Sequence, residues 1–489
     1  MAEVQQVPLQ TETESSPPSP THWRDVARLF PSFSLQQVLQ ALTGFLIVRL
    51  LLPEQYGVWS LFALVLFYAM QLHLGAINLM HREVPFLIGQ KDYARARQVE
   101  SIAFSTSLTN CTIAAFLVIA VWLVWRPRTV TLFQIVLLGL FIVFQELFTY
   151  VNYWLRAYQR FKSLSLFLTT FACANLIAVA LLAWWKQLTG VLLGYVISNG
   201  VVSSYFIARE KVTVHLRPAW PQNWHRLRQA AQLLLWTMMF IFLTTLDRLF
   251  ISYRLGVLTL GFFGISLLIS NFLYNSADVV LQVLFPKANA IMGSTGIAGD
   301  VGRLLLNSAE TLSYILSAVL GLGFLLLPVV IPFLLPRYEP GIPAARIICL
   351  GLAWLVLAQL ISVAYIALGK VQLCLLLQLL VLVVKAALLF MVHSPHLTTV
   401  STISNVANLV YLLVVVFANP VTDWRPFNAI SRLAVPWVLV GSALWLAEVA
   451  HPLLSRPFGQ ALVISGIYLV VIIPLLWAFH QFLRRLAHV

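Results

Sequence analysis

Charged residues are scarce in this chain. Only 10% of its 489 residues are Asp, Glu, Lys or Arg, against about 25% in soluble globular proteins. Hydrophobic residues make up 60% of the chain, and the mean hydropathy is +0.87. This composition excludes a soluble globular protein and predicts a chain that crosses a membrane many times.

Cysteine is scarce as well. The four cysteines all lie in apolar runs, and no two of them have the spacing of metal ligands: Cys111, Cys173, Cys349 and Cys374. Thiols in such surroundings usually pack as small hydrophobic groups. We therefore expect no disulfide and no metal site.

Enzymatic motifs are missing. The sequence has no glycine-rich nucleotide-binding loop and no helical His-Glu-x-x-His. It also lacks an outward loop long enough to hold a catalytic domain, which argues against a lipid-carrier ligase. We expect a protein that is not an enzyme, binds no cofactor and does not hydrolyse ATP by itself.

Long apolar runs are what the sequence does have. Each run is long enough for one helical crossing of a bilayer, and about 14 such spans give an all-α, polytopic membrane protein. The predicted spans are Phe33–Leu52, Tyr56–Asn78, Ser101–Trp125, Val130–Tyr150, Ser163–Trp185, Gly190–Ala208, Ala231–Tyr253, Leu258–Gln282, Ser308–Ile331, Ile342–Leu368, Val371–Val392, Leu397–Ala418, Leu433–Val449 and Leu462–Phe482.

The polar segments suggest the domain organisation. Met1–Pro20 is rich in Ser, Pro, Thr and Glu, and we expect a disordered tail there rather than a signal peptide. Thr21–Pro31 is amphipathic and is expected to lie at the membrane interface. The predicted units are a tail with an interfacial helix (1–32), a six-helix bundle (33–208), a linker (209–230), a second six-helix bundle (231–418) and a C-terminal helix pair (419–489).

The basic residues indicate the orientation. With both termini in the cytoplasm, 21 of the 31 Lys and Arg residues fall in the tail and the cytoplasmic loops, as the positive-inside rule requires. The net charge of +14 therefore needs no nucleic-acid partner. We expect a multi-pass protein of the cell (inner or plasma) membrane.

The second bundle repeats the first. Arg49-Leu50 followed by Tyr56-Gly57 is similar to Arg254-Leu255 followed by Leu260-Gly261. Six helices separate the two copies, so both begin on the same side of the membrane and the repeat is parallel. A repeat of this kind predicts two pseudo-symmetric bundles that face each other, with a binding site between them.

A polar stripe marks one side of that site. Within Leu258–Gln282 four polar residues share one helical face, because their spacing is i, i+4, i+7 and i+11: Asn271, Asn275, Asp278 and Gln282. Polar groups without partners are unfavourable in hydrocarbon by several kcal/mol. The stripe must face protein or a water-filled cavity; packing between helices is the alternative.

Other polar residues lie at membrane depth in the remaining spans. They are Gln71, Asn78, Glu146, Asp247, Arg248 and Lys385, with Arg49 and Arg254 near span ends. Ionisable groups there usually have a partner or a task. Snorkelling to the headgroups is the alternative for the two arginines at span ends. An internal salt bridge or a helix-packing pair is the alternative for Asp247 and Arg248.

The segment Arg49-Leu-Leu-Leu-Pro-Glu-Gln-Tyr-Gly57 resembles the polysaccharide-export flippases of the multidrug/oligosaccharidyl-lipid/polysaccharide (MOP) superfamily. The resemblance continues through most of Phe33–Val392. It is carried by His81-Arg-Glu83, Gly89-Gln-Lys-Asp92, Asp247-Arg248, Leu255-Gly256, Leu260-Gly261, Pro286 and Tyr338…Gly341. Phe262-Phe263 departs from the Tyr often found after the second glycine, which weakens any inference about the sugar.

The resemblance implies a cavity between two lobes that opens alternately inward and outward. The expected cargo is a polyprenyl-diphosphate-linked oligosaccharide (an O-antigen or exopolysaccharide repeat unit), and a polysaccharide polymerase is an expected partner. The substrate-binding residues would be Arg49, Arg248, Arg254, Lys385, Gln71, Asn78, Asn271, Asn275 and Gln282. A proton or sodium ion would be carried by Asp247, Asp278 and Glu146.

Two other functions fit the same sequence. A multidrug exporter of the same superfamily would move amphipathic cations and would need a net acidic cavity. A membrane scaffold for polysaccharide or cell-wall synthesis would transport nothing, and substitutions in its cavity would have no effect.

Overall fold

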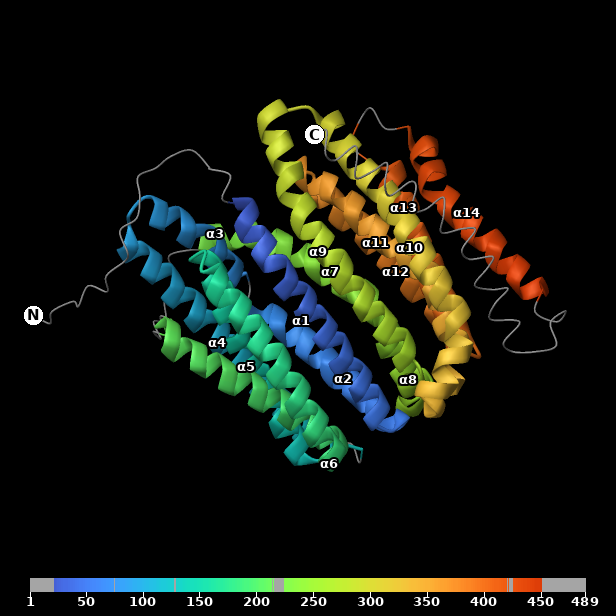
Figure 1. Cartoon of the computed structure of the whole chain (residues 1–489), viewed down its shortest axis with the longest axis horizontal. Coiled ribbons are helices and arrows are strands. Elements are labelled where there is room, and N and C mark those ends of the chain that lie inside the picture. Colours follow the sequence, from blue (N-terminus) through green and yellow to red (C-terminus); the bar gives the residue numbers. More distant parts are fainter. Residues whose placement is uncertain are drawn as a thin grey trace, which may run out of the picture.

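The fold was analysed in a computed structural model. It describes residues 22–450, apart from residues 74, 127–128, 213, 215–223, 420 and 422–424. Every regular element in that part of the chain is a helix (Figure 1). Nine of the described helices are long and apolar enough to cross a membrane. The predicted all-α, polytopic membrane fold is confirmed.

The first half of the chain forms an N-terminal lobe, coloured blue to green in Figure 1. Its helices are α1 (His22–Leu50), α2 (Pro53–Ala69), the short 3-10 helix η1 (Met70–His73), α3 (Ala76–Gly89), α4 (Tyr93–Trp125), α5 (Leu132–Ala157) and α6 (Phe161–Glu210). The predicted interfacial segment is continuous with the first span, because α1 begins at His22.

The second half forms a C-terminal lobe, coloured green to red. Its helices are α7 (Trp224–Arg254), α8 (Val257–Phe262), α9 (Gly264–Thr295), α10 (Ala298–Leu334), the 3-10 helix η2 (Pro336–Gly341), α11 (Ile342–Ala367), α12 (Val371–Met391), α13 (Leu397–Phe417) and α14 (Pro426–Ala450). The second member of the predicted C-terminal pair, Leu462–Phe482, lies outside the described residues.

The helices begin where the sequence supplies caps. Asp92 accepts a hydrogen bond from the backbone N–H of Arg95 (3.0 Å) at the start of α4. Thr131 and Gln134 form a reciprocal capping box at the start of α5. Pro53 occupies the first turn of α2, where its missing N–H is harmless. These caps satisfy N–H groups that a helix start leaves without partners.

Every predicted span from Phe33 to Val449 lies on helix, but some boundaries differ. The predicted span Tyr56–Asn78 is divided between α2, η1 and α3, and Gly75 between them has φ 80°. Two predicted spans form the 50-residue α6, which contains non-helical backbone at Lys186 and Gln187. The linker boundary also differs, since α7 already begins at Trp224.

Corresponding turns of the two lobes share one geometry. Gln159 (φ 53°) ends α5 and Gly369 (φ 69°) ends α11, both in the left-handed region. In each turn the following N–H donates to a carbonyl five residues back: Arg160 to Leu155 (3.0 Å) and Lys370 to Tyr365 (2.7 Å). This is the helix-ending motif that favours glycine, and its repetition supports the internal repeat.

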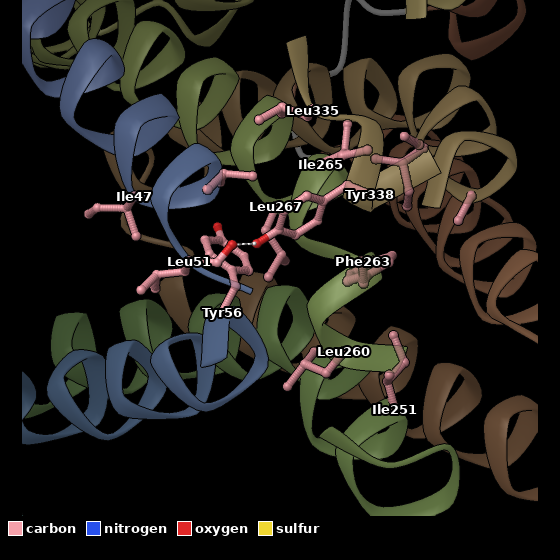
Figure 2. Packing of buried hydrophobic residues seen from close by; sticks show 14 of the residues in the cluster. Ile47, Leu51, Tyr56, Ile251, Leu260, Phe263, Ile265, Leu267, Leu335 and Tyr338 are labelled. Carbon is pink, nitrogen blue, oxygen red and sulfur yellow. Dashed lines mark hydrogen bonds between the residues drawn. The ribbon is translucent and has the colours of Figure 1, made fainter. Parts of the chain in front are cut away.

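The lobes meet where α1 turns into α2 and α7 turns into α8. Figure 2 shows buried side chains from both lobes around this point, and the Tyr338 hydroxyl donates to the Leu51 carbonyl oxygen (3.1 Å). A Cβ on Gly57 would overlap the Val257 carbonyl, and a Cβ on Gly261 would overlap the Pro53 carbonyl. We call this reciprocal contact of α2 and α8 the glycine contact; it closes one end of the lobe interface.

Candidate substrate site at the lobe interface

The helix α7 presents polar residues on two different faces. Leu243 and Asp247 are four residues apart and lie on one face, while Thr245 and Arg248 lie on another. The contacts of α7 follow this division. Its first face packs against α12, where Lys385 donates to the backbone carbonyl oxygen of Leu243 and to the carboxylate of Asp247. Its second face lies against α2, where the hydroxyls of Tyr68 and Thr245 form a hydrogen bond.

Arg248 is the central residue of the candidate site. Its side chain is buried, with 7% exposed, and its guanidinium lies within electrostatic range of Tyr56 and Tyr68 on α2 and of Tyr274 on α9. Its Nη2 donates weakly to Asn271 Oδ1 (3.4 Å). Its Nε has no hydrogen-bond partner among the described side chains. A guanidinium in this position is an attractive site for a phosphate or carboxylate.

The N-terminal lobe contributes Tyr68 to the same region. The Tyr68 hydroxyl and Thr245 Oγ1 form a hydrogen bond of 2.6 Å across the lobe interface. The Tyr68 ring also packs against Phe242, with 5.2 Å between the ring centroids. The site therefore combines a buried cation with hydroxyl groups from both lobes.

Asp247, the neighbour of Arg248, points away from this region into the C-terminal lobe. Its Oδ2 lies 2.8 Å from Lys385 Nζ, and its Oδ1 accepts a hydrogen bond from Ser404 Oγ (2.6 Å). Lys385 also donates to the carbonyl oxygen of Leu243 (2.8 Å) and is only 2% exposed. The predicted alternative of a bond between Asp247 and Arg248 is wrong: the ion pair joins Asp247 to Lys385.

The arginines at the span ends lie apart from this cluster. Arg49 and Arg254 are both exposed, at the last turns of α1 and α7. Arg254 Nη2 donates to the His393 carbonyl oxygen (3.5 Å). Both arginines flank the glycine contact in sequence, so they lie at the closed end of the interface.

The structure places the predicted polar stripe on α9. Asn271 is exposed and contacts Arg248. The other three members lie in the same helix, but their side chains are outside the described part of the chain: Asn275, Asp278 and Gln282. Asn78 lies in α3 and its side chain is likewise not described, whereas Gln71 is half-buried in η1.

Glu146 is buried in the N-terminal lobe, away from Arg248. Its side chain is 1% exposed, and neither carboxylate oxygen meets hydrogen-bond geometry with a described group. Its polar neighbours are Ser107 and Cys111 on α4. Cys111 in turn lies 3.7 Å from the Ala69 carbonyl oxygen. A carboxyl group in such surroundings is suited to carrying a proton.

Several residues of the site were not predicted as site residues. Tyr56, Tyr68, Thr245 and Tyr274 surround Arg248, and Ser404 binds Asp247. The sequence held one signal: on a continuous helix Tyr68 would share a face with Gln71, Gly75 and Asn78, although the structure divides this segment between α2, η1 and α3. Nothing in the local pattern identifies Ser404, because its partner lies 157 residues away.

The described residues contain no group of three or more His, Cys, Asp and Glu that would hold a metal ion. The four cysteines are free; Cys173 is exposed and the other three are buried. The polar chemistry of the described interface is therefore that of guanidinium, amide and phenol groups.

The sequence matches no known family model and no curated protein, but its fold is similar to solved structures. The lipid II flippase MurJ in an inward closed conformation has a TM-score of 0.70 at 11% identity, covering 94% of this chain and 100% of its own. An inward-facing multidrug-resistance MATE transporter of the MOP superfamily has a TM-score of 0.62 at 16% identity, covering 82% and 96%. A point mutant of the Vibrio cholerae MATE transporter VcmN has a TM-score of 0.55 at 13% identity, covering 88% and 100%. The chain therefore has the fold of these flippases and transporters.

Proposed function

We propose that this chain is a flippase. It would move a polyprenyl-diphosphate-linked oligosaccharide, such as an O-antigen or exopolysaccharide repeat unit, from the cytoplasmic to the outer leaflet by alternating access. The observation that carries the proposal is the position of Arg248, whose buried guanidinium lies at the lobe interface. No carboxylate among the described side chains forms a hydrogen bond with it. A diphosphate needs such a cation to cross hydrocarbon.

The same observation favours an anionic over a cationic cargo. Among the described residues Lys385 is a second buried cation of the C-terminal lobe, and Asp247 neutralises it. Arg248, in contrast, has its one described side-chain hydrogen bond with the neutral amide of Asn271. Asp247 is also within electrostatic range of Arg248, but its carboxylate is bonded to Lys385 and Ser404. The other described side chains around Arg248 are phenols, a hydroxyl and an amide. These groups also bind sugar hydroxyls. A net acidic cavity, as a multidrug exporter of cations needs, is not what these residues form.

The movement would be a change in how the two lobes contact each other. The interface is closed at the glycine contact. The excess of basic residues in the loops of the other side supports an orientation in which that closed end would face away from the cytoplasm. Opening there and closing at the cytoplasmic end would release the cargo outward. Arg49, Arg254, Gln71, Asn78, Asn275 and Gln282 would contact the cargo along its route, while Asp278 and Glu146 would carry a proton or sodium ion.

The experiment is a flipping assay in vesicles with a fluorescent polyprenyl-diphosphate sugar. We expect Arg248→Gln to lower the flipping rate at least about tenfold, because removing one partner of a charge-assisted bond is worth about 1.5–3 kcal/mol. Arg97→Gln is the matched control, since Arg97 is exposed at the start of α4. Unchanged flipping by Arg248→Gln would contradict the proposal.

The MATE neighbours make drug export the second candidate. It predicts that vesicles with the protein accumulate a cationic dye, and that Arg248→Gln leaves this accumulation intact or improves it. A scaffold for cell-wall synthesis predicts neither activity. The same vesicle preparation therefore distinguishes all three functions.

A further inference from the structure

The two faces of α7 connect an ion pair deep in the C-terminal lobe with the site at the lobe interface. Asp247 and Arg248 are consecutive, so their side chains point in directions about 100° apart around the helix axis. One side chain is fixed by α12 and α13 and the other faces α2 and α9. A rotation of α7 would move both.

Three side chains of neighbouring helices hold α7 in its rotational position. Lys385 Nζ on α12 lies 2.8 Å from Asp247 Oδ2 and donates to the Leu243 carbonyl oxygen at 2.8 Å. Ser404 on α13 donates to Asp247 Oδ1 at 2.6 Å. One turn further along α7, Phe250 packs edge-to-face against Phe390 of α12, with 5.7 Å between centroids. Rotation of α7 about its axis would break these hydrogen bonds and the aromatic contact together.

We infer that Lys385, Asp247 and Ser404 position Arg248 for the anionic group of the cargo rather than contacting cargo or coupling ion themselves. The inference rests on the proposed function for its ligand, and it gives Lys385 and Asp247 a role other than the one their charge alone suggests. Lys385 is 2% exposed and uses its ammonium on Asp247 and a carbonyl. It is therefore not available to a diphosphate.

The electrostatics explain why a charged pair serves this purpose. A buried ion pair is poor at raising stability, but breaking it leaves an uncompensated charge in a low-dielectric interior, which is strongly unfavourable. The pair therefore penalises every rotation of α7 that separates Asp247 from Lys385. A neutral contact of the same shape would tolerate such rotations more readily.

The first test compares single and double substitutions in the vesicle assay. We expect Lys385→Gln to raise the half-saturating concentration of the fluorescent polyprenyl-diphosphate sugar at least about tenfold. Asp247→Asn with Lys385→Gln leaves no unpaired charge, so it should recover most of the loss. Lys370→Gln is the matched control, because Lys370 is exposed at the start of α12. A double variant that folds normally but stays inactive would overturn the inference, since it would mean that one of the two charges acts directly.

The second test reads the helix rotation itself, independently of transport. In a Cys173→Ser background, a maleimide should label Thr245→Cys slowly, because this position is 3% exposed at the lobe interface. Lys385→Gln should raise the labelling rate, because rotation of α7 would move Thr245 out of its packed position. Equal rates with and without Lys385→Gln would overturn the inference.

A milder variant covers the case in which Lys385→Gln does not fold. Ser404→Ala removes the 2.6 Å bond to Asp247 without exposing a charge. It should raise the half-saturating concentration about two- to fivefold while the melting temperature stays near that of the wild type; no change would count against the inference. Normal flipping by Arg248→Gln, together with the expected labelling changes, would contradict the proposed function. The role of the ion pair in fixing the rotation of α7 would still hold.

Discussion

Gly57 and Gly261 hold equivalent places in the two lobes, and each lies against the backbone of the other's helix. Gly57 contacts the carbonyl of Val257, four residues before Gly261, and Gly261 contacts the carbonyl of Pro53, four residues before Gly57. The contact is thus two-fold symmetric. Helices approach this closely only where both lack a side chain, so the repeated glycine noted in the sequence is the means by which one end of the interface closes.

Alanine at either glycine should therefore open this end. Overpacking of a tight contact is unfavourable by about 1–3 kcal/mol, so Gly57→Ala or Gly261→Ala should shift the population toward the open form about fivefold or more. Labelling of Leu51→Cys, which is fully buried beside the contact, measures the shift. Gly89→Ala is the control, because nothing lies within 4 Å of its Cβ position. Equal labelling of all these variants would argue against closure by the glycine contact.

The hydrogen bond between Tyr68 and Thr245 should also hold the lobes together. Tyr68→Phe removes it, while Thr245 Oγ1 keeps its bond to the Ile241 carbonyl oxygen (2.7 Å). A net loss of about 0.5–1.5 kcal/mol predicts a two- to tenfold increase in the labelling of Leu51→Cys. Tyr205→Phe, at an exposed position of the same lobe, should have no effect; a similar increase there would show that the hydroxyl bond is not the cause.

Charge rather than shape should govern the position next to Arg248. Asn271→Asp is nearly isosteric but places a carboxylate at the Arg248 guanidinium, which Asn271 contacts at 3.4 Å. It should therefore raise the half-saturating concentration of the polyprenyl-diphosphate sugar more than Asn271→Leu does, at least about tenfold. The opposite order would mean that Asn271 binds cargo by shape and hydrogen bonding alone.

Glu146→Gln should leave the protein stable. Neither of its carboxylate oxygens meets hydrogen-bond geometry with a described group, so the melting temperature should stay the same or rise. If Glu146 carries the coupling proton, the flipping rate of this variant should no longer depend on an imposed pH gradient. Glu54→Gln, at an exposed position, should keep that dependence. A gradient-dependent Glu146→Gln would exclude Glu146 as the proton carrier.

The pH dependence of stability should include a contribution from His81 on α3. His81 is exposed on one side and packs edge-to-face against Tyr153, with 5.5 Å between the ring centroids. Partial desolvation, and then the positive charge of Arg156, lower the pKa of His81 from its ordinary value. The unfolded chain therefore binds a proton more readily than the folded protein. The contribution of His81 to the free energy of unfolding should be constant above about pH 6.5, the ordinary histidine pKa. It should become unfavourable as the pH drops from there through the folded-state pKa. His81→Phe should reduce the slope of the melting temperature against pH in this range. An unchanged slope would contradict the prediction.

The sequence was enough to find the helices and to suggest the two lobes. Apolar runs such as Val371–Val392 and Leu397–Ala418 correspond to α12 and α13 within a few residues, because a helix must satisfy its own backbone in lipid. It also identified Arg248 and Lys385 as unusual, since a charge at membrane depth is rare. Boundaries failed at Gly75 and at the two helices α8 and α9, where short breaks interrupt an otherwise apolar run.

What the sequence by itself determined is which residues are helical and which face of its own helix each occupies, because helical periodicity is a local property of the backbone. Only the tertiary structure decided which faces meet. It paired Asp247 with Lys385, 138 residues away, left Arg248 at the lobe interface, and joined Gly57 to the helix of Gly261. Those choices depend on how side chains from distant segments fill shared space, which no periodicity along the chain records.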